Sequence, residues 1–172
     1  MNLAGTRGLP ICYMIQNNQI ALDTFVVGQS GAETFGDKGP AMGIPSWSID
    51  GSDPGQFYSS TAVAREIAVS GGGSTLIHVE TMRGCGHAHH HDDLYLGSPS
   101  GNPPGYVDRE LLDYWADKDP VPNHREYLIR NGCSEKLLTR IETEERRMVD
   151  DCRGEMESMP WPEGHSVGEG SN

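Results

Sequence analysis

A strand–helix–strand unit in the middle of the chain constrains the fold more than any other feature of the sequence. Residues 46–50 (SWSID) alternate apolar and polar side chains and predict a strand, and residues 74–83 (STLIHVETMR) predict another. The segment between them predicts a helix that is capped by Ser52 or Asp53 and ends at the three glycines of 71–73. Strands joined in this way pair in parallel through a right-handed crossover. The unit therefore predicts an α/β fold with a parallel sheet and flanking helices.

An apolar run near the start of the chain predicts a further strand, which is followed by four amides. The run is ICYMI, residues 11–15, and the amides are Gln16, Asn17, Asn18 and Gln19. Amide side chains are poor formers of both helices and strands. Ligands of open α/β sheets bind at the carboxyl ends of the strands, so the amides are candidate ligand-binding groups. A polar turn is the simpler alternative.

A second polar cluster follows the predicted strand that ends at residue 83. Residues 83–105 carry Gly, Pro, His and Asp without periodicity, and a loop of this length is usually functional or disordered. In a parallel sheet this loop leaves at the same edge as the amides. Zinc or iron ligation is one interpretation, but a glycine-flanked histidine run offers no fixed geometry, so adventitious metal affinity is favoured. The residues concerned are His87, His89, His90, His91, Asp92 and Asp93.

The rest of the chain is predicted to be helical. Helices are expected from residue 108, from Pro120 and over residues 134–152, and the last has an apolar stripe that is expected to be ordinary packing. The stripe consists of Leu137, Leu138, Ile141, Met148, Val149 and Cys152. The expected organisation is a domain half at 1–107 with the 83–105 loop, a helical extension at 108–159 and a flexible tail at 160–172.

Composition limits the classes of partner. The net charge of −12 argues against nucleic acid and anionic membranes, and no apolar run reaches the ~20 residues that span a bilayer. The 35% apolar share, with 22 Gly and 11 Pro, indicates a loop-rich chain that relies on a partner to complete its core. The four cysteines, Cys12, Cys85, Cys133 and Cys152, lack CxxC spacing and are expected to be reduced thiols. A cytoplasmic protein is expected.

The order of these motifs resembles the alpha subunit of the decarboxylating component of 2-oxo acid dehydrogenase complexes. Residues 2–24 are similar to the second half of the thiamine diphosphate motif, which begins with Gly-Asp-Gly and closes with Asn-Asn. GIP at 43–45, IDG at 49–51, the strand at 74–79 and the RGCGHA loop at 83–88 follow in the family's order. The resemblance extends to about residue 155 and implies a partial thiamine diphosphate-binding fold.

The resemblance implies a role for five residues. Asn18 matches the side-chain ligand of the Mg²⁺ that holds the cofactor's diphosphate, and Ile20 matches the position whose carbonyl also binds that ion. Such oxygen donors suit magnesium. Gln16 stands where some members carry a phosphate-contacting arginine. His87 matches the loop histidine that reaches the cofactor and assists acyl transfer, and Arg83 matches the arginine that orders the loop.

Two departures from the family pattern bear on function. Ala88 replaces the serine that mitochondrial members phosphorylate, so that switch is expected to be absent. The Gly-Asp-Gly element, whose Asp is another magnesium ligand, does not occur before the Asn-Asn pair. The resemblance thus implies a split alpha subunit in a hetero-oligomer, whose partners are an N-terminal half carrying Gly-Asp-Gly, a beta-type subunit and a lipoyl domain or acyl carrier protein. A non-catalytic assembly remnant and a truncated or misassigned start remain alternatives.

Overall fold

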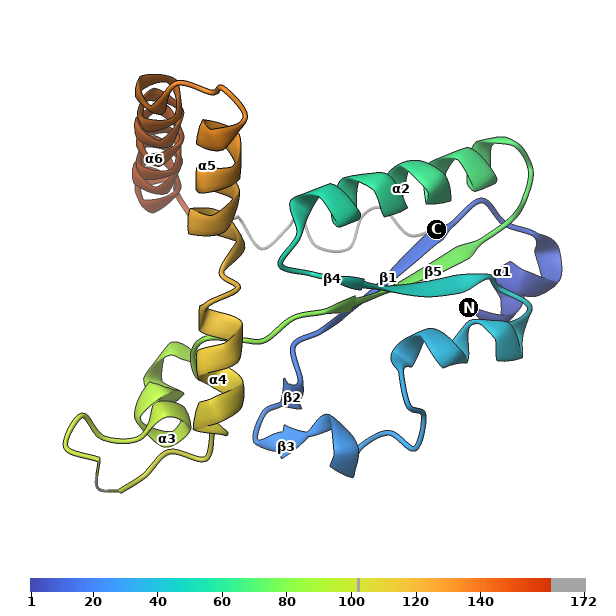
Figure 1. Ribbon diagram of the computed structural model, residues 1–172, viewed down its shortest axis with the longest axis horizontal. Helices are drawn as coiled ribbons and strands as arrows, with labels where there is room; N and C mark the ends of the chain where they lie inside the picture. Colours follow the sequence, from blue (N-terminus) through green and yellow to red (C-terminus); the bar gives the residue numbers. More distant parts are fainter. Residues whose placement is uncertain (102, 162–172) are drawn as a thin grey trace. The chain divides into compact units, whose positions relative to one another are not determined.

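The computed structural model describes residues 1–101 and 103–161 (Figure 1). The chain divides into two compact units, the first Met1–His124 and the second beginning at Arg125. The helix that follows residue 107 therefore belongs to the first unit. Of the tail expected at 160–172, only the first two positions are among the described residues.

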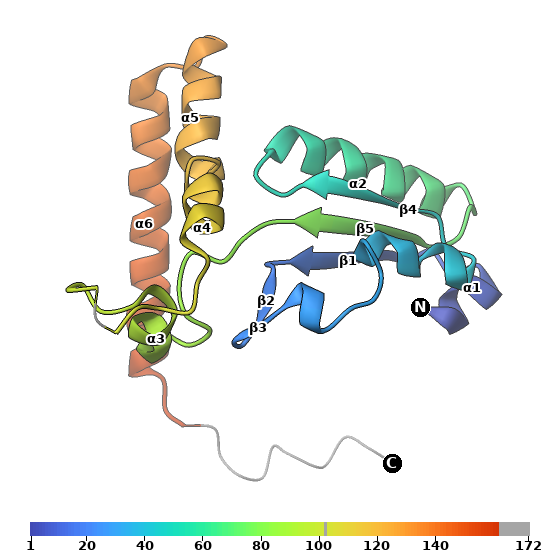
Figure 2. The same ribbon diagram turned by 60° about the horizontal axis from the view of Figure 1, so that its bottom comes forward.

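A three-stranded parallel sheet forms the centre of the first unit. Its strands are β1 (Cys12–Asn17), β4 (Ser46–Asp50) and β5 (Thr75–Glu80), and their spatial order is β1-β5-β4. Figure 2 shows the three arrows side by side and pointing the same way. The prediction of an α/β fold with a parallel sheet is confirmed.

Two strand ends differ from the prediction. β1 continues through the first two amides, because Gln16 and Asn17 pair with Val79 and Glu80 of β5. Backbone pairing with a central strand thus outweighs the low strand propensity of the amides. β5 ends at Glu80, three residues earlier than predicted, because both neighbouring strands, β1 and β4, end opposite this residue.

Helix α2 (Pro54–Val69) covers one face of the sheet. The side chain of Asp53 caps it by accepting hydrogen bonds from the backbone of Gly55 and Gln56, which selects Asp53 over Ser52 as the cap. The core on this face consists of Ile49, Ala64, Ile77 and Val79, with Trp47 and Phe57 packed against them. Burying each large apolar side chain contributes about 1.5–3 kcal/mol.

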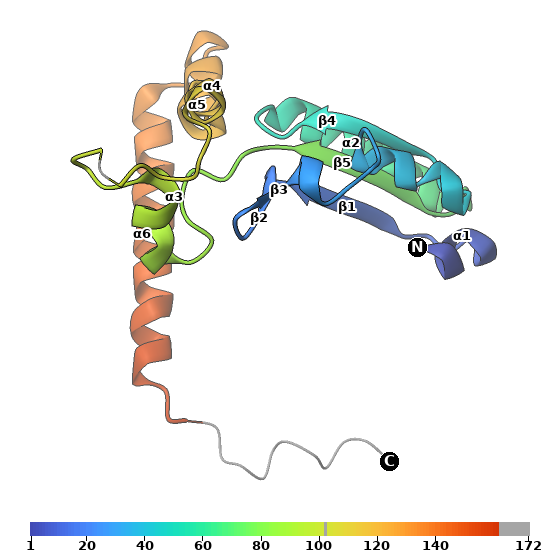
Figure 3. The same ribbon diagram turned by 90° about the horizontal axis from the view of Figure 1, so that it is seen from below.

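Short 3₁₀ helices cover the other face of the sheet. They are η2 (Phe35–Lys38) and η3 (Pro40–Met42), which Figure 3 shows on the side away from α2. Before them, β2 (Ile20–Ala21) and β3 (Thr24–Phe25) form a small antiparallel hairpin after β1. The remaining short elements that precede the sheet's second strand are α1 (Asn2–Arg7) and η1 (Val26–Gly28).

The segment predicted as an aperiodic loop contains two short helical elements. These are η4 (His89–His91) and α3 (Asp92–Leu96), and α4 (Arg109–Ala116) follows the segment. A second apolar cluster explains why the segment is ordered: its buried members are Ile20, Tyr95 and Val107, with Phe25, Met82, Leu96, Tyr106 and Leu112 packed against them. Packing against residues far away in the sequence therefore orders a segment that has no periodic pattern of its own.

The second unit is built on an antiparallel pair of helices. α5 (Pro120–Arg130) crosses into it from the first unit, and α6 (Glu135–Ser158) begins at the cap Ser134 and extends beyond the predicted end. Arg125 joins the two helices through ion pairs with Glu135 and Glu142.

The apolar stripe of α6 is not packed as predicted. The exposed fractions of Ile141, Met148 and Val149 are 43%, 51% and 67%. Within the described residues, α5 packs beside α6 and leaves these side chains exposed (Figure 2). In the described part of the chain, no helix combines the length and the apolarity that a bilayer span requires.

Candidate functional site

The turn after β1 is built by its two asparagines. Asn17 is buried and its Oδ1 accepts a hydrogen bond from the backbone N–H of Gln19 at 3.0 Å. Asn18 is exposed and its Oδ1 accepts from the backbone of Ile20 at 3.4 Å. Gln19, which follows the two asparagines, has a φ of 72°, in the left-handed region that non-glycine residues rarely adopt. Asparagine side chains favour such turns, so the sequence forms this one locally.

The turn and the hairpin that follows it contain two kinds of oxygen atom that can bind a metal ion. The Ile20 side chain is only 3% exposed, and its burial holds the β2 backbone in place. A pocket of about 160 Å³ adjoins the turn, lined by Ile15, Gln16, Asn17, Asn18, Ile20, Ala21, Val26, Gln29 and Phe35. The Asn18 amide and the Ile20 carbonyl are the donor types that magnesium accepts.

Arg83 connects the loop to this hairpin. Its Nη2 donates to the carbonyl of Leu22 at 2.5 Å and to the Tyr106 hydroxyl at 2.6 Å. The Tyr106 hydroxyl in turn donates to the same Leu22 carbonyl at 2.9 Å. The two ends of the loop, at Arg83 and Tyr106, therefore meet at the hairpin that carries Ile20.

Tyr95 contacts both the backbone carbonyl and the guanidinium group of Arg83. It is fully buried, and its hydroxyl donates to the Arg83 carbonyl at 2.9 Å. The guanidinium carbon of Arg83 lies 4.7 Å from the centre of the Tyr95 ring, within cation–π range. Burial raises the pKa of the Tyr95 hydroxyl, so it remains a donor across the neutral pH range.

His87 lies exposed on the anchored part of the loop. Next to it Gly86 is buried, and its N–H donates to the Asp92 carboxylate at 2.7 Å. A Cβ at Gly86 would come within 2.6 Å of the His91 carbonyl carbon, so this close approach requires glycine. The loop thus holds the His87 backbone while leaving its imidazole open to a ligand or partner.

The structure brings most of the predicted site residues to one region. Asn18 and Ile20 lie on the turn and hairpin, Gln16 lines the adjoining pocket, and Arg83 bonds to the same hairpin. His87 lies four residues beyond Arg83. Within the described residues, no group of three or more His, Cys, Asp or Glu side chains is arranged to hold a metal ion. The four cysteines are free thiols.

The sequence did not reveal the contacts of three residues that shape this site, although it suggested Asp92 as a metal ligand. Tyr95, Tyr106 and Asp92 are joined to Arg83 or Gly86 by hydrogen bonds, as described above. The only local signal was the apolar triplet at 94–96, inside an otherwise polar segment. Contacts between residues far apart in such a segment have no sequence period.

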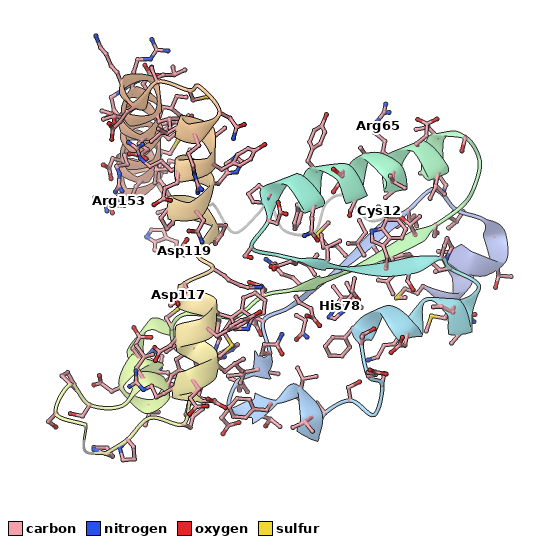
Figure 4. The ribbon with its side chains drawn as sticks, viewed as in Figure 1. Cys12, Arg65, His78, Asp117, Asp119 and Arg153 are labelled. Carbon is pink, nitrogen blue, oxygen red and sulfur yellow. The ribbon has the colours of Figure 1, made fainter. Side chains whose placement is uncertain are left out.

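A buried histidine lies outside the candidate site, on the sheet face away from α2 (Figure 4). His78 is 1% exposed, its Nδ1 is 3.0 Å from the Ser48 hydroxyl, and its ring lies edge-on to Phe35. Burial lowers its pKa, while the carboxylates of Glu80 and Asp37 act in the opposite direction. His78 is therefore a neutral core residue near pH 7.

Comparison with known proteins gives a consistent family. Residues 1–164 match the family described as "Dehydrogenase E1 component". The pyruvate dehydrogenase E1 component subunit alpha of Bacillus subtilis (strain 168) is 35% identical over 156 residues, which cover 91% of this chain and 38% of that protein. The proteins of the same description from Bacillus cereus and Acholeplasma laidlawii are 38% and 33% identical, over 77% and 92% of this chain. The chain spans only 33% and 44% of their lengths.

Proposed function

Because this chain belongs to the dehydrogenase E1 component family, we propose that it acts as the C-terminal part of an alpha subunit in the decarboxylating component of a 2-oxo acid dehydrogenase complex. The observation that carries the proposal is the attachment of Arg83 to the hairpin of Ile20, which brings the amide turn and the histidine loop to one edge of the sheet. Ligands of parallel sheets bind at this edge.

The residues at the turn fit the magnesium ion and diphosphate of thiamine diphosphate. The Asn18 amide oxygen and the Ile20 carbonyl would hold Mg²⁺, and Gln16, which lines the same pocket, would contact a phosphate oxygen. Thiamine diphosphate, when bound, supplies the stabilised carbanion that decarboxylation of a 2-oxo acid requires. The aspartate of the Gly-Asp-Gly element would come from polypeptide outside these 172 residues, either a separate N-terminal half or a longer form of the chain.

The loop would contribute to acyl transfer. The exposed imidazole of His87 can hold and release a proton at the acceptor, a lipoyl domain or an acyl carrier protein. Arg83 would act by holding the loop on the hairpin, through its bonds to Leu22 and Tyr106. A beta-type subunit would complete the site.

The test compares His87→Ala with His90→Ala in the complex assembled with its partner subunits. His87→Ala should reduce acyl transfer to the physiological acceptor by about 100-fold, the usual contribution of a positioned acid–base group. Decarboxylation measured with an artificial electron acceptor should fall much less, because that assay omits the transfer. His90→Ala is the control from the same loop and should retain both activities.

Thermal melts of each assembled complex separate a folding defect from a chemical one. His87 is exposed, so its replacement should cost little stability. If His87→Ala matches His90→Ala in both activities, the proposed role of the histidine fails, and a non-catalytic assembly role for the chain becomes the better account.

A further inference from the structure

An ion pair ties the end of β4 to the segment that follows α4. The Nζ of Lys118 donates to Oδ2 of Asp50 at 2.8 Å, and the two residues are 68 positions apart in the sequence. The other carboxylate oxygen of Asp50 accepts from the backbone and the hydroxyl of Ser52, at 2.9 and 2.5 Å. Asp117 and Asp119, on either side of Lys118, mark this junction in Figure 4.

The lysine also lies over two aromatic rings of α4. Its Nζ is 4.8 Å from the centre of the Tyr114 ring and 5.3 Å from that of Trp115, both within cation–π range. The side chains of Lys118 and Asp50 are 34% and 30% exposed, so the pair is partly shielded from water. One ammonium group therefore joins the end of α4 to the edge of the sheet.

Both partners remain charged through the ordinary pH range. The hydrogen bond with Asp50 raises the pKa of Lys118 above its usual value. Burial alone would raise the pKa of Asp50, but its hydrogen bonds with Lys118 and Ser52 outweigh burial and lower it. Stability from Asp50 is lost only as the pH falls below about 4 through its lowered pKa, and stability from Lys118 only as the pH rises above about 10.

The ion pair anchors the C-terminal end of helix α4, and Arg109 at the other end donates to the Leu96 carbonyl. The helix has eight residues and none of them is fully buried, so apolar packing alone holds it weakly. Its Leu112 packs against the cluster of Ile20, Tyr95 and Val107. Tyr106, whose hydroxyl bonds to Arg83 and Leu22, lies just before α4 in the chain.

A pocket continues from the ion pair to the amide turn. Its volume is about 470 Å³, and Asp50, Lys118 and Trp115 line it together with Gln19, the residue next to Asn18. Asp50 ends β4 and Asn17 ends β1, and both pair with Glu80 of β5. The ion pair and the candidate site therefore lie at the same edge of the sheet.

We propose that Asp50 and Lys118 are positioning residues that hold α4 against the sheet and thereby place Tyr106 and the loop end at the candidate site. Neither residue would touch the cofactor or the substrate. Only the effect on catalysis rests on the proposed function; the effect on the loop follows from the contacts of this chain alone.

The experiment measures hydrogen exchange and kinetics for Lys118→Met, Asp50→Asn and Lys118→Arg in the full chain and in the assembled complex. Lys118→Met and Asp50→Asn should each speed exchange of the backbone amides of 92–96 and 106–116 by about threefold or more, because local opening becomes easier. Exchange in β5 should not change. Lys118→Arg keeps the cation and its reach to the rings, and should restore slow exchange.

The matched control is Arg147→Met in α6. Arg147 and Asp151 also form a 2.8 Å ion pair, but their side chains are 73% and 64% exposed and lie in the second unit. This variant should leave exchange at 92–96 and 106–116 unchanged. In the complex, Lys118→Met should lower kcat by about threefold or more with the KM for the 2-oxo acid nearly constant, and Lys118→Arg should recover it.

Two outcomes would overturn the inference: unchanged exchange at 92–96 and 106–116 in Lys118→Met, or no recovery of slow exchange with Lys118→Arg. If Lys118→Met fails to fold, Asp50→Asn tests the same ion pair, and the reverse also holds. If exchange responds but the assembled complex has no activity on 2-oxo acids, the positioning role stands and the proposed function fails. If that activity is present but exchange and kcat do not respond, the proposed function stands without the positioning role.

Discussion

The hydroxyl of Tyr95 provides a quantitative test of how the loop is ordered. Tyr95→Phe removes one oxygen and leaves the ring, its edge-on contact with Tyr106 at 5.3 Å and its position under Arg83. The lost group is the donor to the Arg83 carbonyl at 2.9 Å, from a fully buried side chain. A hydrogen bond contributes about 0.5–1.5 kcal/mol, and leaving its partner unpaired adds to the loss, so Tyr95→Phe should cost about 1–2 kcal/mol.

Tyr95→Ala should cost considerably more. It also removes the ring from the cluster with Ile20 and Val107, and replacing a buried aromatic side chain with alanine costs about 3–5 kcal/mol. The difference between the two variants, about 2–3 kcal/mol, measures the packing of the ring apart from its hydroxyl.

Urea unfolding of the full chain, followed by tryptophan fluorescence, measures both changes. Trp47 and Trp115 lie in the same unit as Tyr95, so their emission reports on that unit. With a slope of about 2 kcal/mol per molar urea, Tyr95→Phe should lower the midpoint by about 0.5–1 M. Tyr58→Phe is the matched control, because Tyr58 is 79% exposed on α2.

A midpoint shift for Tyr95→Phe no larger than that of Tyr58→Phe would show that the Tyr95 hydroxyl does not stabilise the loop. Equal destabilisation of the phenylalanine and alanine variants would show that the ring makes no contribution. Burial raises the pKa of Tyr95, so the difference from wild type should be constant between pH 6 and pH 9. A difference that disappears within this range would show that another group holds the loop.

Two further predictions concern Asn18 and His78. In the assembled complex, Asn18→Ala should abolish magnesium-dependent binding of thiamine diphosphate. It should cost about 1 kcal/mol of stability or less, because the exposed side chain makes one long hydrogen bond, from the Ile20 backbone at 3.4 Å. Calorimetric titration that shows wild-type affinity would contradict the ligand assignment. His78 has a lowered pKa through burial, so the unfolded state binds its proton first, and stability should fall as the pH decreases below about 6.5 toward the folded pKa. His78→Gln should remove this dependence, which amounts to at most about 1.4 kcal/mol per pH unit; unfolding free energies that fall equally in both proteins between pH 7.5 and pH 5 would assign it to other groups.

The sequence alone was sufficient for the parts of the fold that are specified locally. The alternation of residues 46–50 predicted β4 with its observed bounds. The candidate caps Ser52 and Asp53 and the three glycines at 71–73 delimited α2, and the structure selected Asp53 as the cap. The order of short motifs predicted the family to which the chain belongs. These signals are local because strand period, helix caps and turns depend on neighbouring residues.

The tertiary structure decided how the loop is held. Arg83 meets Leu22 across 61 positions, Tyr106 meets Leu22 across 84, and Lys118 meets Asp50 across 68. None of these pairs has a spacing that a helix or strand period would reveal, and each depends on β1, β5 and β4 ending at one edge. The motif order indicated which residues could bind a cofactor, while contacts between distant parts of the chain bring them together, because side chains in an aperiodic segment are placed by their partners and not by their neighbours.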